Sequence, residues 1–426
     1  MRPAMPTSCP LPPPRSAAAA AMLALLVLAA MGCDKAAAPC PADACPAGFR
    51  CEPSSGECQL IQPRQTKEIP LFGAITTVPS PSGPPAVVGY AADRQSLAAL
   101  DSSGLFYVAG PAAVGGEEPA GQTSAAWRGS DQRLRVAWIR ENDRILWLSE
   151  QTAGGWKRTK VAGEAVGPLA MTEHKAALTV AYRRADATGL RVATRQAGEA
   201  WLIEDVPLPP PPLGQTAPVH DLGRSLSMVS MASGLAVSAY DATYGDLVLA
   251  VKVGASWSVS RLFGSDPASG ADLGDMGNPA VLAAGPDGEL VVAYRDATAG
   301  SVVLSRSQGG VMARKTVATG LRAGPNGTQL RDLLGTSLAL AVRTDGRAVV
   351  AWFNARQWRV GYAVEKPGGT FEPGSLPPGS DGGAEAWPAL SVAADGAVWM
   401  TWVALQPAHG PAGSRVGQAK ILQGVP

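Results

Sequence analysis

The stretch PAVLAAGPDGELVVAYRDATAGSVVLS, residues 279–305, contains two turn signals between apolar runs. Asp287-Gly288 separates the first two runs, and Asp-Gly between apolar runs is a strong β-hairpin signal because glycine accepts the positive φ of the turn. The second run ends at Tyr294, and the sequence DATAG at residues 296–300 then leads into a third run. The stretch therefore predicts three successive antiparallel strands joined by tight turns.

This pattern recurs along the chain. SGLAVSAYDATYGDLVLA (residues 233–250) is a clear copy, and DGRAVVAW (345–352) and DGAVWMTW (395–402) repeat its first half. An aromatic residue ends the equivalent strand about every 50 residues, at Tyr90, Trp138, Tyr182, Tyr240, Tyr294, Trp352 and Trp402. A fourth strand is expected to begin near Trp156, Trp201, Trp257, Val311 and Phe371.

Four strands in about 50 residues, repeated along the chain, are typical of a β-propeller. We predict an all-β propeller over residues 66–426 with seven four-stranded blades; six blades are the alternative, because the Tyr90 copy is the weakest. After Trp402 only one more strand fits before the chain ends, so the last blade should lack its outer strand. We expect residues 66–72 to supply it, and the first blade's inner strand to lie at residues 75–78.

These repeats resemble those of the broad sialidase-like or BNR-like group of exported bacterial proteins. The resemblance covers nearly all of residues 66–422 and implies the propeller fold, but it says little about activity because propellers host unrelated functions. The Asp-box Ser-x-Asp-x-Gly-x-Thr-Trp is absent, and SDGGAEAW at residues 380–387 is the nearest stretch. No catalytic residue of the group can therefore be carried over to this chain.

Composition excludes several other classes. The formal net charge is +1, so there is no basic surplus for neutralising nucleic-acid phosphates, and we expect no nucleic-acid partner. Hydrophobic residues make up 46% of the chain and charged residues only 17%, which argues against global disorder. The 49 glycines and 37 prolines interrupt any long helical pattern, which argues against a helical bundle.

Residues 1–32 are predicted to be a lipoprotein signal peptide. Arg2 and Arg15 precede an apolar run at residues 17–31, which is too short to span a bilayer, and the run ends in Ala-Ala-Met-Gly-Cys33. This ending resembles a bacterial lipobox, so we expect Cys33 to carry the lipid anchor on the exported side of the cell envelope. An ordinary cleaved signal peptide is the alternative, and the choice between inner and outer membrane stays open.

Residues 33–60 are predicted to form a small disulfide-rich stub, followed by a linker at residues 61–65. Four cysteines cluster here, at Cys40, Cys45, Cys51 and Cys58. In an exported chain this clustering predicts two disulfides, for which three pairings are open. The run from Cys45 to Cys58 loosely resembles the end of an EGF-like module, which implies Cys40–Cys51 and Cys45–Cys58. A four-cysteine zinc site is the competing interpretation, and the lack of tight C-x2-C pairs disfavours it.

No catalytic constellation stands out. Asp186, Asp241 and Asp296 occupy the same repeat position in Asp-Ala-Thr turns, which favours a turn-forming role over catalysis. The chain has only three histidines, and His220-Asp221 is the one adjacent His–carboxylate pair. A nucleophile elbow, a P-loop and an HExxH motif are all missing from the sequence. We therefore expect the protein not to be an enzyme.

Three loops depart from the repeat: residues 207–224, 264–278 and 318–335. Each should connect one blade to the next, which places all three on one face around the central channel, where propellers commonly bind ligands. The candidate ligand-binding residues in these loops are His220, Asp221, Asp266, Asp272 and Asp275. The three aspartates of the second loop make Ca²⁺ an alternative, but their spacing is not that of an EF-hand. We therefore predict no metal and no cofactor.

The leading functional hypothesis is a monomeric, lipid-anchored, non-catalytic module that binds a protein or a glycan at the cell envelope. Two alternatives remain: a sialidase-like carbohydrate-active enzyme, and a structural spacer without a specific ligand. The enzyme would require arginine and acidic side chains to converge at the channel mouth.

Overall fold

In the computed structural model the chain forms two compact units, residues 1–45 with 49–59 and residues 46–48 with 60–426. In the first unit the described residues belong to a two-stranded sheet of β1 (Phe49–Cys51) and β2 (Cys58–Leu60). The structure describes residues 49–51, 58–60, 71–80, 85–91, 94–101, 104–113, 119–121, 123–186, 188–215, 220–266, 268–308, 311–323, 329–375, 384–393, 396, 398–407 and 415–423.

The second unit contains six four-stranded antiparallel sheets and one three-stranded sheet, each with its strands in sequence order. The first three blades consist of β3 (Leu71–Val78), β4 (Ala86–Ala91), β5 (Ser96–Asp101) and β6 (Gly104–Ala109); β7 (Ser124–Arg128), β8 (Leu134–Arg140), β9 (Ile145–Thr152) and β10 (Gly155–Ala162); and β11 (Ala165–His174), β12 (Ala177–Arg184), β13 (Leu190–Arg195) and β14 (Trp201–Val206). A short 3₁₀ helix, η2 (Ala197–Glu199), links β13 to β14.

The remaining blades continue the same order. They consist of β15 (Leu222–Met231), β16 (Gly234–Asp241), β17 (Asp246–Val253) and β18 (Ser256–Phe263); β19 (Met276–Ala284), β20 (Leu290–Asp296), β21 (Ser301–Gln308) and β22 (Val311–Thr319); β25 (Leu334–Val342), β26 (Ala348–Asn354), β27 (Arg359–Glu365) and β28 (Phe371–Ser375); and β29 (Ala384–Val392), β30 (Val398–Pro407) and β31 (Arg415–Gln423). A separate hairpin, β23 (Leu321–Ala323) and β24 (Gln329–Arg331), lies in the connection between the fifth and sixth blades.

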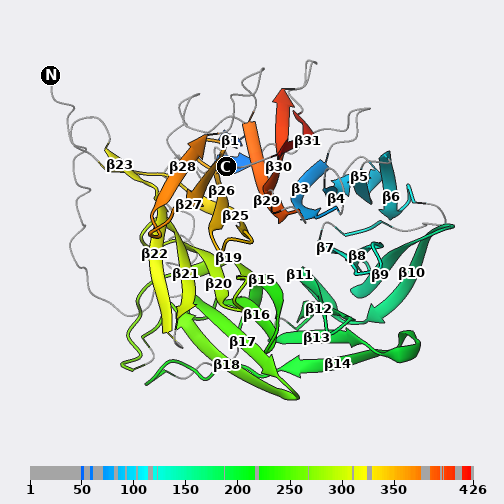
Figure 1. Ribbon diagram of the computed structural model, residues 1–426, viewed down its shortest axis with the longest axis horizontal. Helices are drawn as coiled ribbons and strands as arrows, with labels where there is room; N and C mark the ends of the chain where they lie inside the picture. Colours follow the sequence, from blue (N-terminus) through cyan, green and yellow to red (C-terminus); the bar gives the residue numbers. More distant parts are fainter. Residues whose placement is uncertain are drawn as a thin grey trace, which may run out of the picture. The chain divides into compact units, whose positions relative to one another are not determined.

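The blades close into a ring, which confirms the predicted β-propeller (Figure 1). The inner strand of each blade contacts the inner strand of the next, and β29 of the seventh blade contacts β3 of the first. At this closure the hydroxyls of Thr77 and Thr401 are hydrogen-bonded to each other. The expected starts of the fourth strands are also confirmed, because β10, β14, β18, β22 and β28 begin at or next to the five predicted residues.

One expectation about closure is wrong. Leu71 and Phe72 do not complete the last blade; they begin β3 and pair with Ala91 and Tyr90 of β4 in the first blade. The first blade's inner strand therefore begins at Leu71 rather than at residue 75, and residues 66–70 lie outside the described part of the chain. Within the described residues the seventh blade has three strands, and the ring closes by packing of β29 against β3.

The hydrophobic core lies between the blades. Each of these buried clusters joins residues of two successive sheets, so the second to sixth blades contribute apolar side chains to both of their neighbours. Tyr294, one of the repeated aromatics, is fully buried and stacks on Phe263 of the preceding blade at 4.8 Å between ring centroids. The repeated aromatic is thus a wedge between blades, which explains its regular spacing in the sequence.

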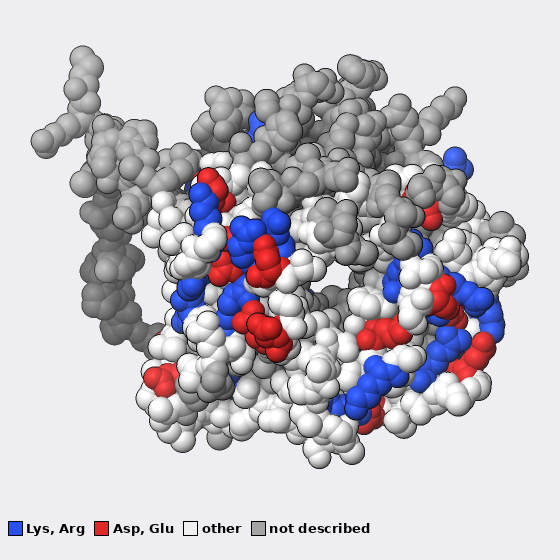
Figure 2. Space-filling model, in the orientation of Figure 1, with Lys and Arg blue, Asp and Glu red and all other residues white. Residues whose placement is uncertain are grey.

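Charges are mixed over the surface. Figure 2 shows a hollow at the centre of the ring and, around it, basic and acidic side chains interspersed with uncharged residues. Ion pairs such as Arg135 with Asp131 (2.7 Å) and Lys157 with Glu199 (2.6 Å) account for part of this mixture. As for membrane spans, none of the described residues belongs to a helix with the length and apolar character needed for one.

Candidate functional site

One face of the propeller carries the candidate site, and we call it the loop face. It is formed by the turns between the second and third strands of each blade and by the connections from one blade to the next. Backbone hydrogen bonds tie these two sets together at four successive blade junctions: Ala185 N–H to Glu164 C=O (2.8 Å), Ala242 to Asp221 (2.9 Å), Ala297 to Asp275 (2.8 Å) and Ala355 to Leu333 (3.0 Å). The four junctions are therefore structurally equivalent and can be compared residue by residue.

His220 lies in a buried ionic cluster. Its Nδ1 is 3.0 Å from Oδ2 of Asp241, and the Arg261 guanidinium lies 3.1 Å from the same oxygen and 2.5 Å from Oδ2 of Asp246. Both carboxylates are fully buried, and burial raises the pKa of Asp246. Because the cluster closes the β16–β17 turn and is shielded from solvent, it fits a structural role better than a base acting on a ligand.

Asp221 does not face His220. Its carboxylate pairs with Arg183 of the preceding blade and accepts a hydrogen bond from Nε of Arg224 (2.8 Å). Its backbone N–H donates to the Thr243 hydroxyl (2.7 Å). Asp221 therefore joins two blades at the loop face.

The three aspartates of the 264–278 loop do not converge. Asp266 accepts hydrogen bonds from the backbone N–H groups of Ala268 (2.7 Å) and Ser269, and these bonds lower its pKa. Asp272 caps the N–H of Gly274 (2.8 Å), and Asp275 accepts the hydroxyl of Tyr240 (2.9 Å). Across the described residues no group of three His, Cys, Asp or Glu side chains has metal-binding geometry. Each of these aspartates thus stabilises its own loop or the neighbouring blade.

The turn-forming interpretation of the recurrent aspartates agrees with the structure. Asp186 accepts the backbone N–H of Thr188 (3.0 Å), Asp241 that of Thr243 (3.1 Å), and Asp296 that of Ala299 (2.7 Å). These bonds shape the second turn of each repeat.

The cysteine predictions stay untested. Cys33, Cys40 and Cys45 lie outside the described residues. Cys51 ends β1 and Cys58 begins β2, and the structure describes only their backbone.

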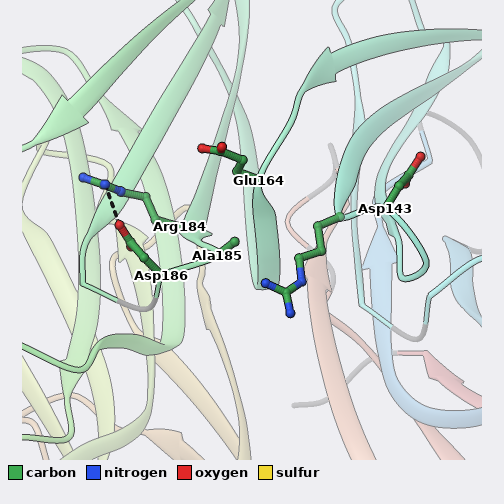
Figure 3. Close-up of a pocket in the computed structure, with 6 residues that line it drawn as sticks. Asp143, Glu164, Arg184, Ala185 and Asp186 are labelled. Atoms are coloured by element: carbon green, nitrogen blue, oxygen red, sulfur yellow. Dashed lines mark hydrogen bonds and ion pairs between the residues drawn. The ribbon is translucent and has the colours of Figure 1, made fainter.

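A groove opens on the loop face between the second and third blades. It has a volume of about 420 Å³ and is lined by Asp143, Arg144, Glu164, Arg184, Ala185 and Asp186 (Figure 3). In Figure 3 Glu164 lies between the Arg184–Asp186 ion pair on one side and Asp143 on the other. A second hollow of about 180 Å³ shares Arg144 and extends toward the inner strands at Thr123 and Gly167. None of the five residues predicted for the ligand loops lines either hollow.

Arg144 lies at the turn position where the fourth and fifth blades have Gly245 and Gly300. Gln95 and Trp358, at the corresponding turns of the first and sixth blades, also have a positive φ. The backbone carbonyl of Arg144 accepts the N–H of Ala165 (2.8 Å), as the carbonyl of Gly245 accepts the N–H of Met276 (2.9 Å) at an equivalent turn. The φ of Arg144 is +57°, close to the +73° of Gly245 and the +68° of Gly300. A left-handed conformation is unfavourable for arginine and favourable for glycine, so the backbone at Arg144, in the groove, is strained.

The Arg144 side chain is exposed. It makes no hydrogen bond or ion pair within the described part of the chain. The sequence contains a signal for this position: Arg144 follows Trp138 at the same spacing at which Gly300 follows Tyr294. The sequence ENDR therefore occupies the place of a glycine-containing turn.

Two acidic groups of the groove, Asp143 and Asp186, have lowered pKa values. Arg140 holds the pKa of Asp143 below its usual range through a side-chain hydrogen bond. Hydrogen bonds from the backbone and hydroxyl of Thr188 lower the pKa of Asp186. Glu164 is exposed, and its closest cation is Arg191 at 3.8 Å. The groove therefore offers several hydrogen-bond acceptors beside two guanidinium donors.

The sequence matches no family model and no curated protein. Solved β-propeller structures are similar to it in fold. A puromycin hydrolase is 14% identical, with a TM-score of 0.50, over 82% of this chain and 52% of that one. The fucose-specific lectin from Aleuria aurantia is 13% identical over 72% and 97% of the two chains (TM-score 0.43). The NanB sialidase from Streptococcus pneumoniae is 9% identical over 70% and 67% (TM-score 0.42). At such identities the likeness shows the fold alone: this chain is a β-propeller.

Proposed function

We propose that the protein is a non-catalytic, glycan-binding β-propeller held at the cell envelope by a lipid on Cys33. The observation that carries the binding function is the groove between the second and third blades, where Arg144 occupies a turn position that favours glycine. A strained residue with an exposed side chain and no partner among the described residues is best explained by a ligand that contacts it.

The chemistry of the groove favours a hydroxyl-rich ligand. Arg144 and Arg184 present donors, while Asp143, Glu164 and Asp186 present acceptors. Sugar hydroxyls both donate and accept hydrogen bonds, so a saccharide can use both kinds of side chain at once. The volume of about 420 Å³ lies within the usual range for small-ligand sites.

The same carboxylates argue against acid catalysis. A general acid needs a raised pKa to hold a proton at neutral pH, whereas the pKa values of Asp143 and Asp186 are lowered. The carboxylate whose pKa is raised by burial, Asp246, has no solvent exposure and lies beneath Arg261 and Ser265. These properties support ligand binding rather than hydrolysis.

A glycan array tests the binding function. The full-length chain in detergent should bind a subset of the glycans, and Glu164→Gln or Arg184→Met should weaken that binding. Asp345→Asn serves as the control, because Asp345 is exposed in a turn between the first and second strands of its blade, away from the loop face. Equal glycan binding by the wild type and both groove variants would remove the basis of the proposal.

The anchor needs a separate test because its residues lie outside the described part of the chain. Metabolic labelling with palmitate should mark the wild-type protein and be lost in Cys33→Ala. Globomycin should block maturation of the wild type. Undiminished labelling of Cys33→Ala would exclude lipidation at this residue.

A further inference from the structure

The junction between the third and fourth blades contains a complete carboxylate site made by the protein itself. Arg183 on β12 forms an ion pair with Asp221 of the following connection, and Arg224 donates to the second oxygen of the same carboxylate at 2.8 Å. Arg183 lies over Gly223, where an added Cβ would come within 3.4 Å of Arg183 Cγ and 2.5 Å of Leu190 Cδ2. The carboxylate of Asp221, bound between Arg183 and Arg224, is therefore the reference for the equivalent position at other junctions of the ring.

The junction between the fifth and sixth blades repeats this arrangement without the carboxylate. Arg295 occupies the place of Arg183, because each follows the repeated aromatic of its blade and pairs with an apolar residue at the start of the next strand, Val302 and Leu190 respectively. An added Cβ on Gly335 would lie 3.2 Å from Val302 Cγ2 and 3.3 Å from Arg295 Cβ, as at Gly223.

Leu333 occupies the position of Asp221. The carbonyl of Asp221 accepts the N–H of Ala242, just after the second strand of the fourth blade, and the carbonyl of Leu333 accepts the N–H of Ala355, just after the second strand of the sixth blade. Thr336 follows Gly335 as Arg224 follows Gly223. The guanidinium is therefore kept at this junction, while its acidic partner is replaced by leucine.

Arg295 consequently lacks a partner. Its side chain forms no ion pair or hydrogen bond with the described residues, whereas the guanidinium of Arg183 pairs with Asp221 through an NH2 group. The neighbouring carboxylate of Asp332 is turned toward the β26–β27 turn, where it accepts hydrogen bonds from Gln357 (2.9 Å) and Asn354 (3.4 Å). A partly buried guanidinium without an acceptor leaves a charge-assisted hydrogen bond unmade.

We propose that Arg295 binds an aspartate or glutamate side chain of a partner protein, which takes the place that Asp221 takes at the equivalent junction. Thr336, whose side chain is exposed, would donate to the second carboxylate oxygen as Arg224 does. An exposed leucine of the same connection, Leu333 (45% exposed), provides an apolar surface beside the charge. Because the template is a protein carboxylate and the surroundings are apolar, the site fits an acidic residue flanked by apolar ones. This site is separate from the glycan groove and does not depend on it.

A carboxylate placed on the chain itself, at residue 333, tests the geometry of the site without a known partner. Leu333→Asp should place a carboxylate against Arg295 and should unfold at a temperature roughly 2 °C higher than the isosteric but uncharged Leu333→Asn. The difference should disappear in an Arg295→Met background. Leu321→Asp and Leu321→Asn, on the same connection, should not differ. If Leu333→Asp is no more stable than Leu333→Asn, the carboxylate site does not exist.

A peptide array tests the partner. The labelled full-length chain should bind peptides with a central Asp or Glu between leucines at least about tenfold more tightly than their Asn or Gln counterparts. Leu333→Asp and Arg295→Met should both lose this preference, and Glu164→Gln, in the glycan groove, should keep it. Binding without preference for the acid, or unaffected by Arg295→Met, would overturn the proposal. Loss of an acidic oligosaccharide rather than of peptides in Arg295→Met would overturn the assignment of a protein partner.

Discussion

Replacing Arg144 with glycine should stabilise the propeller while weakening glycan binding. The turn around residue 144 adopts the left-handed conformation that glycine adopts at the equivalent positions 245 and 300. Relief of that strain stabilises the folded state by about 1–2 kcal/mol. The extra freedom of glycine in the unfolded chain opposes this by about 0.4–1 kcal/mol. We therefore expect the free energy of unfolding to rise by about 0.5–1 kcal/mol.

The effect on binding has the opposite sign. The variant loses the exposed guanidinium shared by the two hollows, and a hydrogen bond from a charged group is worth about 1.5–3 kcal/mol. Affinity for the glycan should therefore fall by about tenfold to a hundredfold. Urea unfolding followed by tryptophan fluorescence measures the first effect, and calorimetric titration with an array-selected glycan measures the second.

Two controls separate the backbone from the side chain. Arg144→Ala should lose affinity to the same extent without the gain in stability, because alanine keeps the left-handed strain. Gln132→Gly should gain stability without losing affinity, because Gln132 has a φ of +63° but lies in the β7–β8 turn, opposite the loop face. Unchanged affinity in both Arg144 variants would refute a binding role. An Arg144→Gly protein no more stable than Arg144→Ala would refute the argument from strain.

Three further predictions concern stability. Tyr294→Ala should lower the free energy of unfolding by about 3–5 kcal/mol, because it leaves a cavity between the fourth and fifth blades; a loss below about 1 kcal/mol in urea unfolding would contradict the wedge role. Arg261→Ala should cost about 3–5 kcal/mol at neutral pH by removing the guanidinium that pairs with the buried carboxylates of Asp241 and Asp246. That deficit should shrink as pH falls and Asp246, whose pKa is raised by burial, takes up a proton, so a deficit independent of pH would speak against it. Arg135 lowers the pKa of Asp131, so this pair's contribution is present above about pH 4 and lost as pH falls further. Asp131→Asn should therefore flatten the acid limb of the stability curve, and an unaltered limb would count against the pair.

Local patterns were sufficient to predict the fold class. The Asp-Gly turns, the strand-ending aromatics and the fourth-strand starts depend on residues near one another in sequence, and the strands begin where these signals place them. Gly288, at the first turn quoted above, has the positive φ (+76°) that this hairpin signal implies. Repetition of the signals then indicated a propeller, because a single sheet of this size could not bury its faces alone.

Ring closure and the contacts of the predicted ligand residues depend on residues distant in the sequence, so local patterns did not predict them. Leu71 pairs with Ala91, within its own blade, although the sequence could equally pair it with the last blade. The predicted ligand residues are polar and lie in long loops, but the tertiary structure gives each of them a partner: Asp241 for His220, Arg183 for Asp221, Tyr240 for Asp275. Polarity alone does not tell a satisfied carboxylate from an available one.

The sequence by itself determined the repeat, and with it the strands, the turns and the stacking of blades, because these follow from hydrophobic period and turn chemistry within about 50 residues. Only the tertiary structure decided which members of the repeat have different contacts. Arg183 and Arg295 occupy equivalent positions, yet one has an aspartate from the next blade and the other a leucine. That difference arises where one blade packs against the next, so it emerges only once the ring is assembled.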